Sequence, residues 1–281
     1  MRTGLLAVAF MLAALAGVAI ADDKPHQPPA SAAKRFIVFD AMGYGQPDTS
    51  RYGMVRFVCF YYILPGDKPP HYRLTMQAFA EGRLPDKSDF IEAVRRHTAK
   101  RNGPIVMDIE GVQLSGDPKI VKPRFRLFVT LVKWAKEAAP DRIVGYYGHG
   151  LFPEKPSPQY AAEAKELADT VDAFFPSMYV FNDNREAWRK KLVGLVAEAR
   201  KIAPGKPVYP FVWPQYHDGT PQQFEFVRGD YWRWQLTTIR ESGADGVVLW
   251  GARRYPNAHK WNEQSDWWQE TVKFARSLPA K

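Results

Sequence analysis

Short apolar segments and helical patterns alternate about seven times along this chain, and that alternation is the strongest constraint on its fold. The expected strands cover residues 35–40, 55–61, 105–107, 142–147, 171–179, 207–213 and 247–250. Strands that alternate with helices form parallel sheets, because each helix carries the chain back to the start of the next strand. We predict an α/β fold, a single (β/α) TIM-like barrel of about seven strands over residues 35–281. A doubly wound open sheet is the alternative, although no glycine-rich dinucleotide fingerprint follows the first strand.

The stretches between these strands carry the spacing of helices. Apolar residues recur on one helical face over about 88–100, 118–139, 160–170 and 263–278, and two further helices run through residues 188–199 and 236–239. The connection 62–87 is rich in proline and glycine, and a short helix around 76–80 is one reading of it. Loops this long inside a compact domain are usually functional.

The first residues resemble a targeting segment rather than part of the fold. Arg2 precedes an apolar run, and Ala19 and Ala21 form a small-residue cleavage pattern, so we expect a signal peptide over 1–21, cut near Ala21. An uncleaved anchor is the alternative. Residues 22–34, rich in proline, alanine and charge, are expected to be a flexible leader. Cys59 is the one cysteine, so no intramolecular disulfide can form, which suits a bacterial periplasmic or secreted protein.

The charge balance narrows the choice of partner. The net charge is +9 at pH 7, which favours anionic partners such as an acidic polysaccharide, although solubility alone also accounts for it. Export and the lack of a binding motif disfavour nucleic acid, and no later segment is long and apolar enough to span a bilayer. We expect a monomer without a cofactor. A metal is not expected, since no His-x-His or similar ligand spacing accompanies the acidic residues.

The most informative acidic residues are Asp108 and Glu110, which directly follow the apolar run at 105–107. In a strand, residues i and i+2 point the same way, so both carboxylates should project from the carboxyl end of the third strand. Active sites of parallel α/β folds lie at that end. Two neighbouring carboxylates resist ionising together, so one retains a proton and can serve as an acid. Structural carboxylates or a metal site are the alternatives.

Aromatic residues collect at the other predicted strand ends. If the sheet closes, Asp40, Tyr147, Tyr179, Trp213, Tyr216 and Trp250 share one mouth with the acidic pair, together with Tyr61, Tyr62, Tyr146 and Gln215. Glycoside hydrolysis needs a protonated carboxyl beside the glycosidic oxygen and apolar walls for a sugar face. His149 and His217 are more readily explained as loop histidines than as catalytic bases.

Five segments in order resemble the barrel strands of hyaluronidase-like glycoside hydrolases. They are Met107-Asp108-Ile109-Glu110, Val144-Gly145-Tyr146-Tyr147, Phe175-Pro176-Ser177-Met178-Tyr179, Pro207-Val208-Tyr209-Pro210-Phe211 and Gly246-Val247-Val248-Leu249-Trp250-Gly251. The resemblance implies a distorted barrel of about seven strands with Glu110 as proton donor. It also implies that Asp108 orients the substrate's acetamido group, whose oxygen is the nucleophile, that Tyr179 and Tyr147 position the sugar, and that Trp250 is its platform.

Together these features predict an exported glycoside hydrolase that cleaves an N-acetylhexosamine-containing polysaccharide with substrate-assisted retention. Arg253 and Arg254, beside Trp250, are candidates for binding a uronate carboxylate, because guanidinium groups pair with carboxylates through two hydrogen bonds. A non-catalytic glycan-binding barrel protein of the cell envelope is the alternative, since Ile109 stands where the family usually has an aromatic residue.

Overall fold

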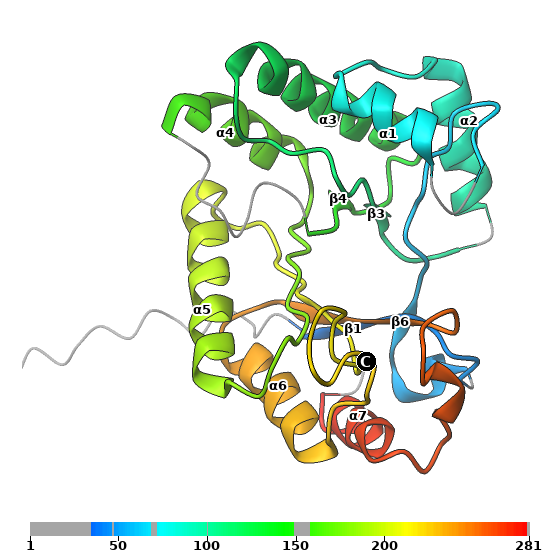
Figure 1. Cartoon of the computed structure of the whole chain (residues 1–281), viewed down its shortest axis with the longest axis vertical. Coiled ribbons are helices and arrows are strands. Elements are labelled where there is room, and N and C mark those ends of the chain that lie inside the picture. The colour runs from blue at the N-terminus through cyan, green and yellow to red at the C-terminus, as the bar shows by residue number, and fades with distance from the viewer. Residues whose placement is uncertain (1–34, 47, 69–71, 100, 149–157, 280–281) are drawn as a thin grey trace, which may run out of the picture. The chain divides into compact units, whose positions relative to one another are not determined.

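Parallel strands alternate with helices throughout the part of the chain that the computed structural model describes, residues 35–46, 48–68, 72–99, 101–148 and 158–279 (Figure 1). The elements in order are β1 (Ile37–Gly43), η1 (Thr49–Tyr52), β2 (Val55–Arg56), α1 (Arg73–Ala80), α2 (Lys87–Thr98), β3 (Ile105–Met107), α3 (Pro118–Ala138), β4 (Val144–Tyr146), η2 (Pro158–Tyr160), α4 (Ala161–Thr170), α5 (Arg185–Ile202), β5 (Phe211–Val212), α6 (Gly229–Glu241), β6 (Gly246–Ala252), η3 (Ala258–Lys260) and α7 (Asp266–Arg276). These residues fall within one compact unit, Arg35–Lys281. The expected signal peptide 1–21, the leader 22–34 and His149 lie outside the described residues.

The strands form two parallel sheets, ordered β2-β1-β6-β5 and β3-β4. Single parallel bridges join them: Phe60 pairs with Met107, Tyr147 with Phe175, and Ser177 with Phe211. Each predicted strand is therefore bridged to the next one, and β6 pairs with β1, as in a TIM-type barrel. The ladders are not continuous around this ring, which is the distortion that the sequence predicts.

Proline explains where the ladder breaks. The predicted strand at 171–179 contains Pro176, and the one at 207–213 contains Pro210. A proline has no N–H to donate to a ladder. In the structure the first segment makes only isolated bridges, and the second keeps a strand only at Phe211–Val212. Both predictions placed the segments correctly but overstated their regularity.

The predicted helices are present, and α1 is the short helix inside the 62–87 connection. Asp117 caps α3 by accepting a hydrogen bond from Lys119 N at 2.8 Å, and Pro118 occupies its first turn. One face of α3 buries Val121, Phe125, Phe128 and Val132. Helices α2 to α4 lie on the β3–β4 side and α6 and α7 on the β1–β6 side (Figure 1). Among the described residues, no helix is both long and apolar enough to span a membrane.

The core has two layers. Val106 belongs to an inner cluster with Phe39, Phe57, Phe175, Phe211 and Val248, which fills the middle of the barrel. Its neighbours Ile105 and Met107 belong to the outer cluster, between the strands and the helices. Alternate residues of a strand therefore point inward and outward, and the inward set decides which side chains can reach the barrel mouth.

Candidate active site

A pocket of about 370 Å³ opens above the inner cluster, with which it shares Cys59, Tyr179, Phe211 and Trp213. Three carboxylates, a cationic group, an imidazole and eight large aromatic rings line it, in order Asp108, Glu110 and Asp218, then Arg254, His217, and Tyr61, Tyr72, Tyr147, Tyr179, Phe211, Trp213, Trp250 and Tyr255. Met76 completes the lining. The pocket is large enough for a sugar-sized ligand and has the mixture of apolar walls and few polar groups that such sites carry.

Strand β3 places the acidic pair in this pocket. Val106 faces the barrel interior, so Asp108, two residues on, continues on the inner side. The Asp108 N–H donates to Phe60 O at 3.2 Å, which holds the strand end against the neighbouring segment. Ile109 between the two acids is buried in the outer cluster. Gly111 then turns the chain away with φ of 85°, a conformation that favours glycine.

Asp108 and Glu110 differ in exposure. The Asp108 carboxylate is largely enclosed, and its Oδ1 has no hydrogen-bond partner among the described residues, whereas Glu110 is exposed. Burial and then the negative charge of Glu110 raise the pKa of Asp108 to about 7, against the opposing effects of Tyr61 and Arg254. The Asp108 carboxyl therefore keeps its proton up to near neutral pH.

Aromatic rings form one wall of the pocket. Tyr179 and Trp250 are stacked, with ring centroids 5.6 Å apart and an interplanar angle of 28°. Trp213 meets Trp250 edge-on at 5.2 Å, and its Nε1 donates to the Tyr44 hydroxyl at 2.9 Å. The Tyr147 hydroxyl donates to Ser177 Oγ at 3.3 Å. These contacts hold the rings in the wall of the pocket that Asp108 and Glu110 also line.

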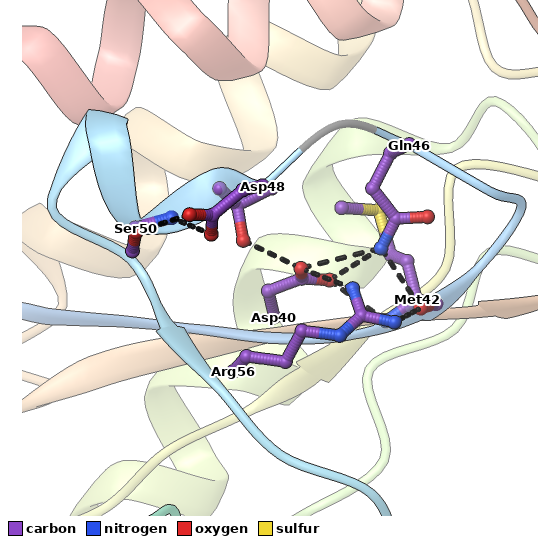
Figure 2. A network of polar contacts seen from close by, with 7 residues as sticks. Asp40, Met42, Gln46, Asp48, Ser50 and Arg56 are labelled. Carbon is purple, nitrogen blue, oxygen red and sulfur yellow. Dashed lines mark hydrogen bonds and ion pairs between the residues drawn. The ribbon is translucent and has the colours of Figure 1, made fainter.

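Asp40 does not belong to this pocket, contrary to the sequence prediction. Strand β1 continues to Gly43, and Asp40 points outward, on the same side of the strand as Val38 and Met42. Its side chain is 0% exposed, and its carboxylate pairs with Arg56 Nη1 at 2.7 Å and accepts hydrogen bonds from Thr49 Oγ1 and Gln46 Nε2 (Figure 2). Every acceptor of Asp40 is occupied by the protein, so it has a structural role.

Five further predicted residues also lie outside the pocket lining: Tyr62, Tyr146, Gln215, Tyr216 and Arg253. Tyr216 packs in the outer cluster, and its hydroxyl donates to the Asp183 carboxylate. Arg253 donates from Nε to Tyr44 O at 2.8 Å, and its guanidinium lies where a side chain on Gly45 would stand. Its neighbour Arg254 does line the pocket and donates to the Tyr255 hydroxyl at 3.1 Å.

The sequence analysis did not select several of the lining residues. Tyr72 and Met76 come from the connection 62–87, whose unusual length was the available signal. His217, which the sequence favoured as a loop histidine, and Asp218 lie shortly after the sixth predicted strand, and their side chains pair with each other. Tyr255 follows Arg254. Among the described residues, no group of three or more His, Cys, Asp or Glu side chains is arranged to hold a metal ion.

Comparisons with known proteins bear on the fold. No protein-family model and no curated sequence matches the chain. Bee venom hyaluronidase superposes on 86% of this chain and 99% of its own, with a TM-score of 0.53 and 18% identity. The fold resembles that of a hyaluronidase. A GH18 chitinase from Pseudoalteromonas aurantia has a similar structure, with a TM-score of 0.51, 13% identity and coverage of 80% of this chain and 78% of its own. The hyaluronidase-like fold agrees with the α/β barrel predicted from the sequence.

Proposed function

We propose that this protein is an exported glycoside hydrolase that cleaves a polysaccharide containing N-acetylhexosamine units. The observation that carries the proposal is the pair Asp108 and Glu110 at the mouth of a barrel, in a pocket lined by stacked aromatic rings, with the pKa of Asp108 raised to about 7. A glycosidic bond breaks when a carboxylic acid protonates the leaving oxygen, and two neighbouring carboxyls beside apolar walls are the arrangement that this chemistry uses. The hyaluronidase-like fold, found in carbohydrate-active enzymes, supports the same class of reaction.

We assign proton donation to Glu110 because its carboxyl is the exposed member of the pair and can reach a bound glycosidic oxygen. Asp108 lies deeper, where an ionised carboxylate stabilises positive charge that develops on the substrate. As Glu110 gives its proton to the leaving oxygen, it gains a negative charge close to Asp108. The energetic cost of two neighbouring negative charges falls when the substrate develops a positive charge beside Asp108.

The nucleophile in this proposal is the acetamido oxygen of the sugar itself. Asp108 and Glu110 come from one strand end and face a bound sugar from the same side, whereas two-carboxylate mechanisms place the groups on flanking sides of the bond. The acetamido oxygen attacks the anomeric carbon while the glycosidic bond breaks, and the resulting ring carries the positive charge that Asp108 faces. Water then opens the ring, giving its proton to Glu110, with net retention of configuration.

The remaining lining residues hold the substrate. Tyr179 and Trp250 supply a platform for an apolar sugar face, with Trp213 behind it, and Tyr147 positions the reacting unit. Arg254, whose positive charge acts on Asp108, offers an anionic sugar a counter-charge at the rim. The polysaccharide is reached outside the cytoplasm in this proposal, since residues 1–21 have the pattern of a signal peptide.

The test is reducing-end release from a panel of amino-sugar polymers, including hyaluronan and chitin, by the wild type and by Glu110→Gln. Loss of the general acid should lower kcat/KM by at least about 10²-fold. Glu241→Gln is the matched control, because Glu241 is an exposed glutamate that does not line the pocket. Undiminished turnover in Glu110→Gln would remove the donor role. Binding of a glycan without release of reducing ends by the wild type would instead favour the non-catalytic glycan-binding protein.

A further inference from the structure

Phe181 is a large aromatic side chain that packing leaves in solvent, with 48% of its surface exposed. Single exposed apolar residues are common on protein surfaces and mean little alone. This one stacks on His217, with ring centroids 4.6 Å apart and an interplanar angle of 27°. His217 lines the pocket, so Phe181 extends the aromatic surface of the pocket beyond its rim.

The rings continue in series from the pocket to the surface. Trp250 stacks on Tyr179 at 28°, Tyr179 faces His217 at 5.8 Å and 31°, and His217 faces Phe181 at 27°. Each successive pair is closer to parallel than to edge-on. A polysaccharide that leaves the pocket along this side therefore meets a further flat ring after the inner platform.

The outer ring is held in place from both sides. Val180 is bridged to Tyr216, and the His217 N–H donates to Val180 O at 2.8 Å, which fixes Phe181 and His217 as neighbours. The Tyr216 hydroxyl donates to the Asp183 carboxylate and ties down the segment that follows Phe181. A ring held in position before binding loses little conformational freedom on contact with a ligand.

We infer that Phe181 and His217 form an outer sugar subsite, which binds an uncharged pyranose of the same polysaccharide, beyond the unit cleaved at Glu110. This inference rests on the proposed function and adds a second binding position to it. The apolar face of the pyranose lies on the Phe181 ring, and the exposed Asp218 carboxylate, paired with His217, accepts hydrogen bonds from its hydroxyls. Asp218 disfavours a uronate there, because like charges repel.

The test compares ligand lengths. Full-length Glu110→Gln, which retains the pocket but not the proton donor, is titrated calorimetrically with chitobiose and chitohexaose, with and without Phe181→Ala. The Kd for chitohexaose should rise about tenfold in Phe181→Ala, since one aromatic contact is worth about that factor, while the Kd for chitobiose changes less than about twofold. Phe181→Tyr should restore the long-chain affinity. Ile120→Ala is the control, because Ile120 is equally exposed, at 48%, and does not line the pocket.

Three outcomes would overturn the subsite: unchanged chitohexaose affinity in Phe181→Ala, an equal loss for both lengths, or a loss of the same size in Ile120→Ala. The proposed function is read separately, from reducing-end release by the wild type against Glu110→Gln. Release that depends on Glu110, together with no effect of Phe181→Ala, removes the outer subsite alone. Absence of both release and binding of either oligomer removes the proposed function and the subsite together.

Discussion

Asp40 and Asp108 were both predicted to lie at the mouth of the barrel, because each carboxylate follows an apolar strand segment. The structure places the two carboxylates in opposite environments. Asp40 faces the helices, is 0% exposed, and accepts hydrogen bonds or ion pairs from Arg56, Thr49 and Gln46. Asp108 faces the barrel interior with Oδ1 unpartnered among the described residues and with Glu110 as a neighbouring charge. A carboxylate satisfied by its own protein stabilises the fold, whereas one left short of partners is available to a ligand.

The largest expected contrast is in catalysis. Asp108→Asn should lower kcat/KM by at least about 10²-fold, because an amide cannot supply the negative charge that stabilises the cationic intermediate. Asp40→Asn should leave kcat/KM per folded molecule within about twofold, since Asp40 does not reach the pocket. Reducing-end release, normalised to the folded fraction by circular dichroism, measures both. Equal losses in the two variants would contradict the division between them.

The second contrast is in stability, to which Asp40 should contribute more than Asp108. Asp40→Ala should lower the free energy of unfolding by about 3 kcal/mol, because it strands buried donors that now have no acceptor. Arg56 is half exposed and can turn to water, which keeps the loss from being larger. Urea denaturation gives the value. A loss below about 1 kcal/mol would show that the network around Asp40 is dispensable.

The third contrast is in pH dependence. The pKa of Asp108 rises from 3.8 to about 7 on folding, so the native state binds a proton that the unfolded state has released over this interval. Stability contributed by Asp108 is therefore complete below pH about 4 and is lost as the pH rises towards 7. We expect the wild type to lose about 3 kcal/mol more than Asp108→Asn between these pH values. Parallel pH profiles for the two proteins would contradict the raised pKa.

Sequence reasoning placed the barrel segments well because their apolar runs, caps and turns agree along the whole chain, as at Asp117-Pro118 before α3. It did not predict which residues of a strand point into the barrel and which point outward. Strands buried on both faces are apolar on both sides, so alternation does not distinguish inward from outward positions. Asp40 and Tyr216 were assigned to the mouth for that reason, and both belong to the outer layer. Asp108 was correctly placed in the mouth because the predicted end of β3, at Met107, matched the structure.

Pocket residues from outside the strands were harder to anticipate. Tyr72 and Met76 lie more than thirty residues before Asp108 in the sequence, and only the folded connection brings them to it. The ring stack of Phe181 on His217 depends on the Val180–Tyr216 bridge, which no local pattern in the sequence encodes. Local signals predict elements, whereas contacts between loops depend on how the whole barrel closes.

Arg253 and Arg254 repeat the Asp40–Asp108 contrast with cations and give the smallest expected effect. Arg253 is committed to Tyr44 O, while Arg254 lies at the pocket, where its guanidinium donates to the Tyr255 hydroxyl and lies over the Tyr255 ring. Arg254→Ala should raise KM for a uronate-containing substrate such as hyaluronan about fivefold and leave KM for chitin oligosaccharides unchanged, because an exposed charge contributes only about 1 kcal/mol. Arg253→Ala should affect both substrates alike, through the position of the Tyr44 loop.

Raised salt should reduce the effect of Arg254→Ala on KM, since mobile ions screen exposed charges. If Arg254→Ala changed KM equally for the acidic and the neutral glycan, the pocket would have no preference for an anionic sugar, and the basic net charge of the chain would reflect solubility alone.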